Sequence, residues 1–418
     1  MLLTNKINNP EAQKSLFITK LNSLCALASL IVLSACGGGA SPSQNQNAPS
    51  SVPQAEDKLS AQAALGEKIF KDVSLSASGK MSCATCHDPA NAHAQSNNLA
   101  VQMGGAKLDV PGFRAVPSLR YLNLTPAFFF AADGTPTGGF TRDGRAQTLA
   151  QQEERPFFAP HEMANMDKAD VINKLQRASY VNEFKQVFGN AILDQAEVAF
   201  DRLQFSLQQY QKEDAEFHSY DSKYDQFLAG KIKLNDAELR GLALFNNPKK
   251  GNCAGCHTSS KGSDGASPLF TDFTYDNLGV PRNYAIPATA DATYFDLGLC
   301  GPDRTDLSTR VDLCGAFKVP TLRNVATRKV FFHNGRFSSL RDAVNFYVRR
   351  DTHPQEWFPV SANGQILKFN DLPAAYINNV NTTEVPYNRK LGMNAALNAN
   401  EVDDVVTFLG TLNDGYKN

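Results

Sequence analysis

The sequence contains the motif Cys-x-x-Cys-His twice. The motif residues are Cys83, Cys86 and His87 in the first copy and Cys253, Cys256 and His257 in the second. Two thiols one helical turn apart can each bond to one vinyl group of a haem, and the adjacent histidine can then bind the iron. A zinc site would need paired knuckles about 15 to 20 residues apart, and a thioredoxin-like pair would lie in a βαβ pattern, which is absent. The spacing therefore predicts two covalently attached haems c, with His87 and His257 as proximal iron ligands.

Helices must position these motifs, and two similar segments, 65–70 and 240–245, precede them. The residues predicted to share an apolar helix face are Ala61, Leu65 and Ile69 in the first segment and Leu239, Leu242 and Ala243 in the second. Such faces are typical of amphipathic helices. Each unit is predicted to run from a helix through a short loop to a haem motif, which is the beginning of a cytochrome c domain.

Two further helices are predicted towards the C-terminus. Asn398 and Glu401 have the spacing of a capping box, and Ser339 offers a second cap for a helix that ends at Arg349. The apolar residues expected on these helices are Val402, Val405, Leu409 and Leu412 on the last and Leu340, Ala343 and Tyr347 on the other.

No run of alternating strand residues appears in the sequence. We therefore expect a mostly α fold of two tandem cytochrome c-type domains, each wrapped around one covalent haem c. The N-terminal domain is predicted over 56–232 and the C-terminal domain over 233–418, with the boundary in the polar stretch 230–236. A length of 418 residues is enough for two such domains.

The N-terminus has the features of an export signal. Three lysines precede an apolar run, 21–35, that is too short to span a membrane and ends at Cys36. The sequence Leu33-Ser34-Ala35-Cys36 resembles a bacterial lipoprotein cleavage box. We expect residues 1–36 to be a lipoprotein-type signal peptide, Cys36 to carry the lipid, and 37–55 to be a flexible tether. A plain secretory signal is the alternative. Either way, the protein is expected in the periplasm, and the lipid at Cys36 would be its attachment to a membrane.

Of the eight cysteines, Cys300 and Cys314 belong neither to a haem motif nor to the signal. In an exported protein a leftover pair indicates a disulfide, with two free thiols as the alternative. The composition is that of an ordinary globular protein, with 42% hydrophobic residues and a formal net charge of -1. This balance gives no sign of nucleic-acid binding, which requires a basic excess or stripe.

Several motifs in order resemble the bacterial di-haem cytochrome c peroxidase family, including its MauG-like branch, from about residue 59 to 414. The residues that carry the resemblance are 65–70, Arg114-Ala115-Val116-Pro117, Asp143-Gly144-Arg145, Glu162-Met163, 319–325 and Phe332-His333-Asn334-Gly335. The resemblance implies that the N-terminal haem reacts with peroxide and that the C-terminal haem transfers electrons. Hydrogen peroxide would be reduced with electrons from a reduced cytochrome or copper protein, or from an oxidisable residue of a protein substrate. The alternative from another class is a di-haem electron carrier without peroxide turnover.

The resemblance also assigns catalytic residues. Glu162 matches the family's distal glutamate, with Gln152 and Pro156 at the family spacing before it. A positioned carboxylate can move a proton from one peroxide oxygen to the other as general base and then acid. The alternative interpretation of Glu162 is an acidic residue near the start of the following helix, which is favourable for the helix dipole. His161 is expected to face solvent.

At four positions the sequence departs from the family. Lys107 replaces a distal histidine, which predicts an open site at the first haem, and His93 is expected to serve its local loop. Tyr347 replaces a methionine ligand of the second haem, as in the MauG-like branch, and a phenolate there would stabilise oxidised iron. The alternative is a tyrosine packed on the haem edge.

The remaining two departures are Arg142 and Ala115. Arg142 replaces the tryptophan between the haems, and the chain's single tryptophan is Trp357. Electrons would need another route, such as Phe140. Ala115 replaces an asparagine that holds calcium in the family, which argues against a calcium site in this protein.

Overall fold

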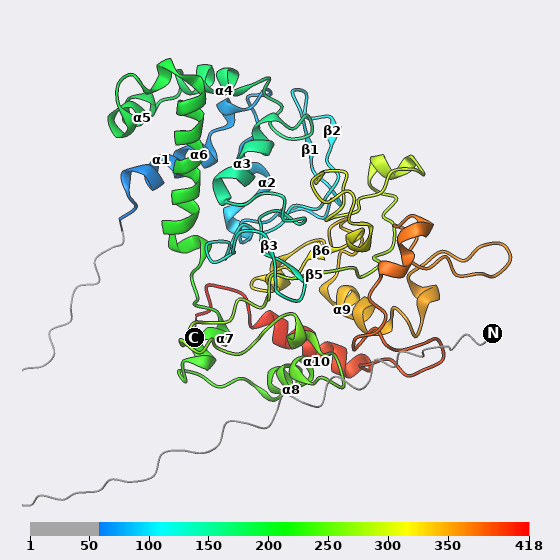
Figure 1. Ribbon diagram of the computed structural model, residues 1–418. Helices are drawn as coiled ribbons and strands as arrows, with labels where there is room; N and C mark the ends of the chain where they lie inside the picture. Colours follow the sequence, from blue (N-terminus) through cyan, green and yellow to red (C-terminus); the bar gives the residue numbers. More distant parts are fainter. Residues whose placement is uncertain (1–57, 418) are drawn as a thin grey trace, which may run out of the picture. The chain divides into compact units, whose positions relative to one another are not determined.

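Ten α-helices and six two-residue strands make up the regular structure of residues 58–417, which the computed structural model describes (Figure 1). The expected signal peptide, Cys36 and the tether lie outside the described residues. The helices are α1 Ala61–Lys71, α2 Cys83–Cys86, α3 Leu149–Phe158, α4 Lys168–Leu175, α5 Val181–Phe188, α6 Ala196–Glu213, α7 Lys223–Leu228, α8 Asp236–Asn246, α9 Leu340–Arg349 and α10 Ala399–Gly410. The prediction of a mostly helical protein is confirmed.

The strands form three antiparallel pairs. They are β1 Met103–Gly104 with β2 Val110–Pro111, β3 Phe129–Phe130 with β4 Pro136–Thr137, and β5 Tyr275–Asp276 with β6 Phe317–Lys318. Long loops and short 3-10 helices, including η6 Cys253–Gly255, connect the remaining elements. No helix between residues 58 and 417 is both long and apolar enough to cross a membrane.

The helix before each haem motif crosses a helix from the end of its own half of the chain. Helix α1 crosses α6 at Gly66, where a Cβ atom would lie 2.0 Å from the Ser206 carbonyl oxygen. Helix α8 crosses α10 in the same way at Gly241, 2.0 Å from the Asp404 carbonyl oxygen. Only glycine allows backbones to approach so closely. The similarity of segments 65–70 and 240–245 therefore reflects one repeated helix crossing.

This crossing corrects the predicted helix faces. Leu65 and Ile69 are buried, but Ala61 is exposed. In α8 the predicted face is wrong, because Leu239 and Ala243 are exposed and Leu242 is half-buried. The face that packs on α10 instead contains Gly241 and the fully buried Phe245. The close backbone contact at glycine rotates this helix away from the orientation that the leucines suggest.

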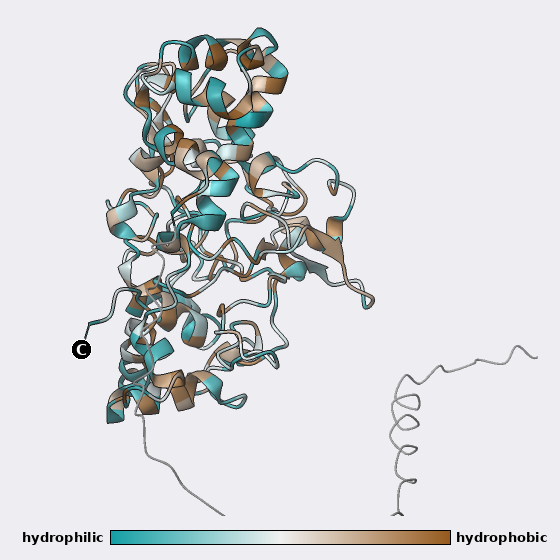
Figure 2. Ribbon diagram, turned by 90° about the vertical axis from the view of Figure 1, so that its left-hand side faces the viewer, coloured by the Kyte–Doolittle hydropathy of each residue, from teal (hydrophilic) through white to brown (hydrophobic). Residues whose placement is uncertain are grey.

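The capping predictions at the C-terminal helices are confirmed. The Asn398 side chain accepts from the Glu401 amide at 3.0 Å, and the Glu401 carboxylate accepts from the Asn398 amide at 2.9 Å. Ser339 Oγ accepts from the Asp342 amide at 3.3 Å and caps α9. The predicted stripe on and after α10 is buried. The helices are amphipathic, and Figure 2 shows hydrophobic and hydrophilic residues alternating along them.

Two large clusters of buried apolar side chains lie in the described part of the chain, together with a small third cluster of Phe140, Ala146 and Leu149. One extends from Leu65 to Phe217 and contains residues of α1, α4, α5 and α6. The other extends from Tyr224 to Leu412 and contains residues of α8, α9 and α10. Figure 1 shows α1, α5 and α6 as one group and α7, α8 and α10 as another. The two haem motifs lie beside different clusters, since Cys83 packs on the first and Cys253 on the second.

Candidate haem and peroxide site

Both haem motifs line one connected cavity of about 510 Å³. The structure brings all the predicted site residues to its wall, namely Cys83, Cys86, His87, Gln152, Glu162, Cys253, Cys256, His257 and Tyr347. They come from α2, α3, the turn after α3, η6 and α9, so residues far apart in the sequence meet here.

The two proximal histidines are held in the orientation that iron binding requires. The His87 ring nitrogen Nδ1 lies 3.0 Å from the Pro117 carbonyl oxygen and 3.2 Å from that of His93. Nδ1 of His257 lies 2.8 Å from the Phe270 carbonyl oxygen. A carbonyl can only accept, so each Nδ1 carries the proton and Nε2 is left as the iron ligand. Burial lowers the pKa of both rings, which keeps them neutral.

Three half-buried cations on the cavity wall fit the propionate groups of haem. Arg142 donates to the Ala115 carbonyl, Lys318 to that of Gly139, and Arg328 to that of Val116. No carboxylate of residues 58–417 forms an ion pair with any of the three. Burial lowers the pKa of Arg142 to about 9, that of Lys318 to about 8 and that of Arg328 to about 10. Charges that are partly removed from water without counter-ions are costly, and haem propionates would supply the missing anions.

Glu162 lies in the turn between α3 and α4 and is fixed there by the β1–β2 hairpin. The Gly105 amide donates to the Glu162 carbonyl at 2.8 Å, and Gly104 packs so closely that a Cβ would lie 2.2 Å from the His161 carbonyl oxygen. Helix α4 begins only at Lys168. The interpretation of Glu162 as a residue at the start of that helix is therefore wrong.

His161 does not face solvent, contrary to the sequence-based expectation. Its side chain is 13% exposed and its Nε2 lies 3.5 Å from Glu162 Oε1. The ring packs edge-on against Phe113, with centroids 4.8 Å apart. The packing of Phe113 and the hairpin turns the ring inwards, which places an imidazole beside the predicted catalytic carboxylate.

Helix α3 brings Gln152 and Pro156 to the cavity wall one turn apart. It also brings Glu153, which the sequence analysis missed. Glu153 is 7% exposed, and its Oε1 accepts from Gln211 Nε2 of α6 at 2.6 Å. Burial raises the pKa of Glu153 well above its usual range, so the carboxyl is protonated. Its spacing of four residues from the buried Leu149 and Phe157 could have revealed it.

Tyr347 projects from α9 into the part of the cavity that contains the second haem motif. Burial raises its pKa, and its side chain packs against the same apolar cluster as Cys253. The ring of Tyr387 lies 6.2 Å away on the same wall, and Tyr387 is buried whereas Tyr347 is half-buried. No sequence pattern had indicated Tyr387, which reaches this wall through the long loop before α10.

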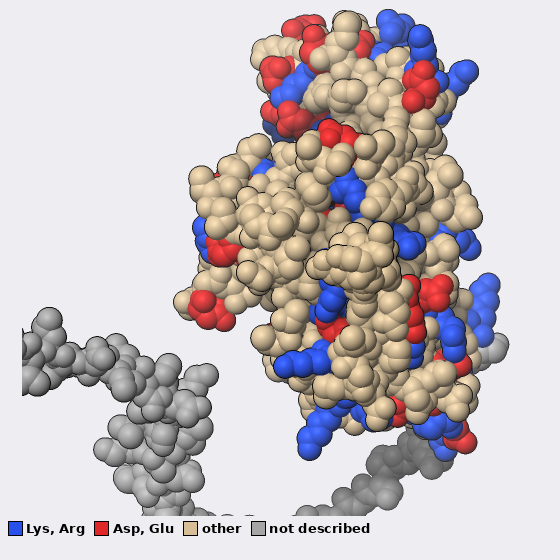
Figure 3. All heavy atoms as spheres, turned by 90° about the vertical axis from the view of Figure 1, so that its right-hand side faces the viewer, with Lys and Arg blue, Asp and Glu red and all other residues tan. Residues whose placement is uncertain are grey.

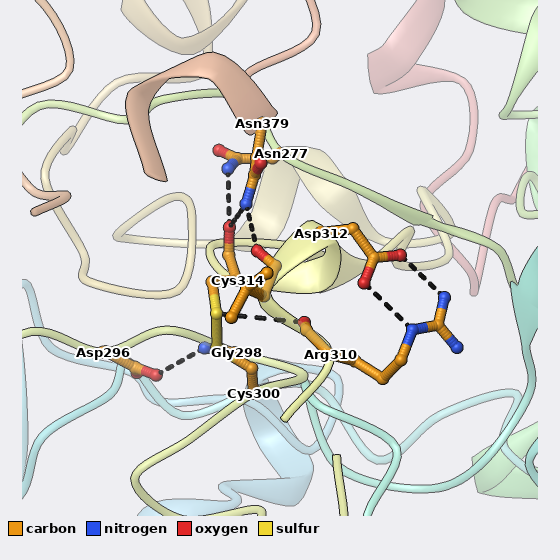
Figure 4. Close-up of a disulfide and its surroundings, with 9 residues drawn as sticks. Asn277, Asp296, Gly298, Cys300, Arg310, Asp312, Cys314 and Asn379 are labelled. Carbon is orange, nitrogen blue, oxygen red and sulfur yellow. Dashed lines mark hydrogen bonds and ion pairs between the residues drawn. A yellow bond between two sulfur atoms is a disulfide. The ribbon is translucent and has the colours of Figure 1, made fainter. Parts of the chain in front are cut away.

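The predicted disulfide between Cys300 and Cys314 is confirmed and closes a loop that reaches the N-terminal half (Figure 4). Asp296, just before the loop, accepts from Arg114 Nε at 2.6 Å. Asp303, inside the loop, accepts from Arg155 Nη2 of α3 at 2.7 Å. Asp296 and the disulfide loop therefore hold Arg114 and Arg155 on the cavity wall. The Arg114 and Arg145 guanidiniums hold the pKa of the buried Asp143 well below its usual range.

Comparisons with known proteins agree with this geometry. Residues 60–233 match the family described as di-haem cytochrome c peroxidase. The methylamine utilization protein MauG of Paracoccus denitrificans is 38% identical over 308 residues, which is 72% of this chain and 77% of that protein. The chain belongs to the di-haem cytochrome c peroxidase family.

Other members are similar along most of the chain. Cytochrome c551 peroxidase of Nitrosomonas europaea is 28% identical over 68% of this chain and 71% of its own. The crystal structure of the diheme peroxidase BthA from Burkholderia thailandensis superposes with a TM-score of 0.78 at 39% identity, over 86% of this chain and 87% of that one. The protein is thus a di-haem oxidoreductase with two covalently attached haems c.

In this di-haem peroxidase, the structure shows which of the residues discussed as departures from the family lie at the haem cavity. Lys107 is exposed and does not contribute to the cavity wall. His93 is fully buried against the Phe217 ring, 4.0 Å between centroids, and its ring nitrogens have no hydrogen-bond partner in residues 58–417. Burial lowers the pKa of His93 to about 3. Phe140 lies on the wall beside Arg142, and Trp357 lies outside this cavity.

Proposed function

We propose that the protein reduces hydrogen peroxide at the haem held by His87 and draws electrons through the haem held by His257. The observation that carries this assignment is the asymmetry of the cavity. Met163, next to Glu162, belongs to the apolar cluster against which Cys83 packs. Tyr347 packs against the other cluster, as does Cys253 of the second motif. The first haem would therefore have the proposed proton-transferring carboxylate in its half of the cavity, and the second haem would have a phenol.

Reduction of one hydrogen peroxide to two waters consumes two electrons and two protons. The haem, when bound, supplies the iron that binds peroxide and conducts the electrons. Glu162 accepts a proton from one peroxide oxygen and returns it to the other as the O–O bond breaks. Gln152 orients the peroxide by hydrogen bonding from α3. Because the Glu162 side chain is 38% exposed, it can exchange its proton with water between turnovers.

At the second haem, Tyr347 is the proposed distal iron ligand. Its phenolate would favour the oxidised iron and close this haem to peroxide. At the first haem, the exposed Lys107 supplies no ligand, so the distal position would stay open. This difference assigns peroxide chemistry to the N-terminal half and electron storage to the C-terminal half.

The proposal extends to the domain organisation, the cellular location and the electron donor. The two apolar clusters support two tandem cytochrome c-type domains, over 56–232 and 233–418, each wrapped around one haem. Covalent haem and a disulfide both fit an oxidising compartment, which supports export to the periplasm with a lipid anchor at Cys36. Electrons would come from a reduced cytochrome or copper protein, or from a residue of a protein substrate.

Peroxide consumption by the isolated holoprotein tests the proposal. A reduced small cytochrome or copper protein should be oxidised by the wild type in a ratio of two electrons per peroxide. A Tyr347→Met variant should show a raised potential at the second haem, because a thioether favours reduced iron. An unchanged potential would show that Tyr347 is not a ligand. No peroxide consumption with any donor would overturn the peroxidase assignment.

A further inference from the structure

Trp357, the single tryptophan of the chain, lies at the border between a buried aromatic cluster and the protein surface. One side of its ring packs edge-on against Phe337 and Phe346, with centroids 5.7 and 5.8 Å away. Its other side lines a surface pocket with Tyr284 and Arg336. The indole is therefore in contact with both the interior and the outside.

An unbroken series of aromatic rings joins Trp357 to the haem cavity. The Phe332 ring lies 5.4 Å from both Phe337 and Phe346, and 5.6 Å from Tyr347. Phe332 and Tyr347 both line the haem cavity. Two routes of equal length thus lead from Tyr347 through Phe332 to the indole, one by Phe337 and the other by Phe346.

Packing alone does not require an indole at this position. Its nitrogen Nε1 is buried without a hydrogen-bond partner in the described part of the chain, although a buried Trp N–H usually finds one. A phenyl ring would fill this position without leaving a polar group unpaired. Indole, however, loses an electron far more readily than a phenyl ring.

The other oxidisable side chain close to Tyr347 does not reach the surface. Tyr387 is 8% exposed and lines the haem cavity itself. Tyr284, by contrast, is 68% exposed beside Trp357 in the surface pocket. On the face that Figure 3 displays, acidic and basic side chains are interspersed with uncharged surface. The charges on this face therefore do not single out one place for electron transfer, whereas the series of aromatic rings reaches the surface at Trp357.

We propose that Trp357 is the residue through which oxidising equivalents leave the second haem for the surface, an inference that rests on the function proposed above. One electron moves from the indole along the phenyl rings towards Tyr347. The indole keeps its N–H proton, because Nε1 has no acceptor, and becomes a cation radical. A donor at the surface pocket then returns the electron.

Without a donor, the indole loses a second electron and takes up the oxygen of one water with release of two protons. Peroxide reduction consumes these two electrons and two protons. The balanced sum is one indole and one hydrogen peroxide giving one hydroxyindole and one water. Trp357 would then carry one additional oxygen atom, which gives the inference a readout that is independent of turnover.

The test uses the holoprotein with stoichiometric peroxide and no donor, followed by peptide mass spectrometry and EPR. The wild type should gain one oxygen at Trp357 and show an indole radical. Trp357→Phe should lose the radical and should retain the oxidised haem spectrum for longer, with unchanged haem content and melting temperature. Tyr416→Phe, at a distant tyrosine, should behave like the wild type.

A Phe332→Leu variant interrupts the ring series while leaving Trp357 in place, and it should reduce the oxidation of Trp357. The inference is overturned if the haems respond to peroxide while Trp357 stays unmodified and Trp357→Phe decays like the wild type. If the haems do not respond to peroxide at all, the peroxidase proposal and this inference are both overturned. The two failures are thus distinguished by the haem spectrum.

Discussion

The guanidinium of Arg142 donates two hydrogen bonds to the backbone carbonyl of Ala115, at 2.9 and 3.1 Å. Both positions are ones at which the sequence is expected to depart from the family, from a tryptophan at one and from a calcium-binding asparagine at the other. Here a fixed cation occupies the carbonyl and lies on the wall of the haem cavity. Arg142 therefore supplies a positive charge of the chain itself to the cavity wall.

We expect peroxide turnover to be independent of calcium. Dialysis against a chelator should leave donor-dependent peroxide reduction unchanged, because Ala115 offers no side-chain oxygen to calcium. A loss of activity that added calcium restores would contradict this expectation.

Replacement of Arg142 should lower the haem potentials. In Arg142→Gln a half-buried positive charge is removed from the wall of the haem cavity, which favours the more positive ferric iron. A potentiometric titration of the holoprotein measures the shift. Arg341→Gln is the matched control, since Arg341 is an exposed arginine of α9 paired with Asp403. Equal potentials in the two variants would show that Arg142 does not face the haems.

Glu162→Gln should lower kcat for peroxide reduction by about 10²- to 10⁴-fold, the usual contribution of a general acid–base group. Haem content and the potentials should stay near those of the wild type. Glu154→Gln serves as control, because Glu154 lies on α3 but is 46% exposed and outside the cavity wall. A Glu162→Gln enzyme with full activity would exclude this carboxylate from proton transfer.

Glu153→Gln should stabilise the protein at neutral pH by roughly 1–3 kcal/mol. The new amide can still accept from Gln211, and it can also donate to the Gln211 oxygen, which lacks a partner in the described chain. The raised pKa of Glu153 means that the folded state keeps a proton that the unfolded state releases. Stability of the wild type should therefore fall as the pH rises above about 4.3, the usual pKa of Glu.

Thermal melting at pH 5 and pH 8 measures this difference. The melting temperature of the variant should exceed that of the wild type by more at pH 8 than at pH 5. The reason is that Gln has no proton to bind, whereas folding of the wild type at pH 8 requires Glu153 to take up a proton. An equal gain at both values would show that Glu153 has the same charge in the folded and unfolded states.

Removal of the disulfide should cost roughly 3 kcal/mol, as expected for a closed loop of this length. A Cys300→Ser/Cys314→Ser variant should also lose part of its peroxide activity, since Asp303 of the loop holds Arg155 of α3. Thermal melting of the wild type with and without a reductant, and of the variant, measures the loss of stability. A variant with wild-type activity would show that the loop does not position the peroxide-side wall.

Local chemistry made much of the site predictable. The spacing within the Cys-x-x-Cys-His motifs, the leftover pair of cysteines and the capping box at Asn398 are all set by a few neighbouring residues, and they reappear in the structure. Tyr347 was found because its helix could be placed from the Ser339 cap and its position could be compared with the family.

Tertiary contacts set the features that the sequence did not reveal. The contact of Gly241 with the Asp404 backbone determines which face of α8 is buried. The spacing of apolar residues in the sequence does not predict this contact. His161 faces inwards because Phe113 and the β1–β2 hairpin cover it. Glu153 depends on Gln211, 58 residues away, and Tyr387 reaches the second haem motif from a long loop.

An EPR spectrum of the as-isolated ferric holoprotein, recorded before and after stoichiometric peroxide, tests the central claim that the two haems differ. We predict a high-spin component from the open haem at His87, a low-spin component from the haem closed by Tyr347, and a change in both on addition of peroxide. Two low-spin haems that do not respond to peroxide would contradict the claim and would indicate a simple electron carrier.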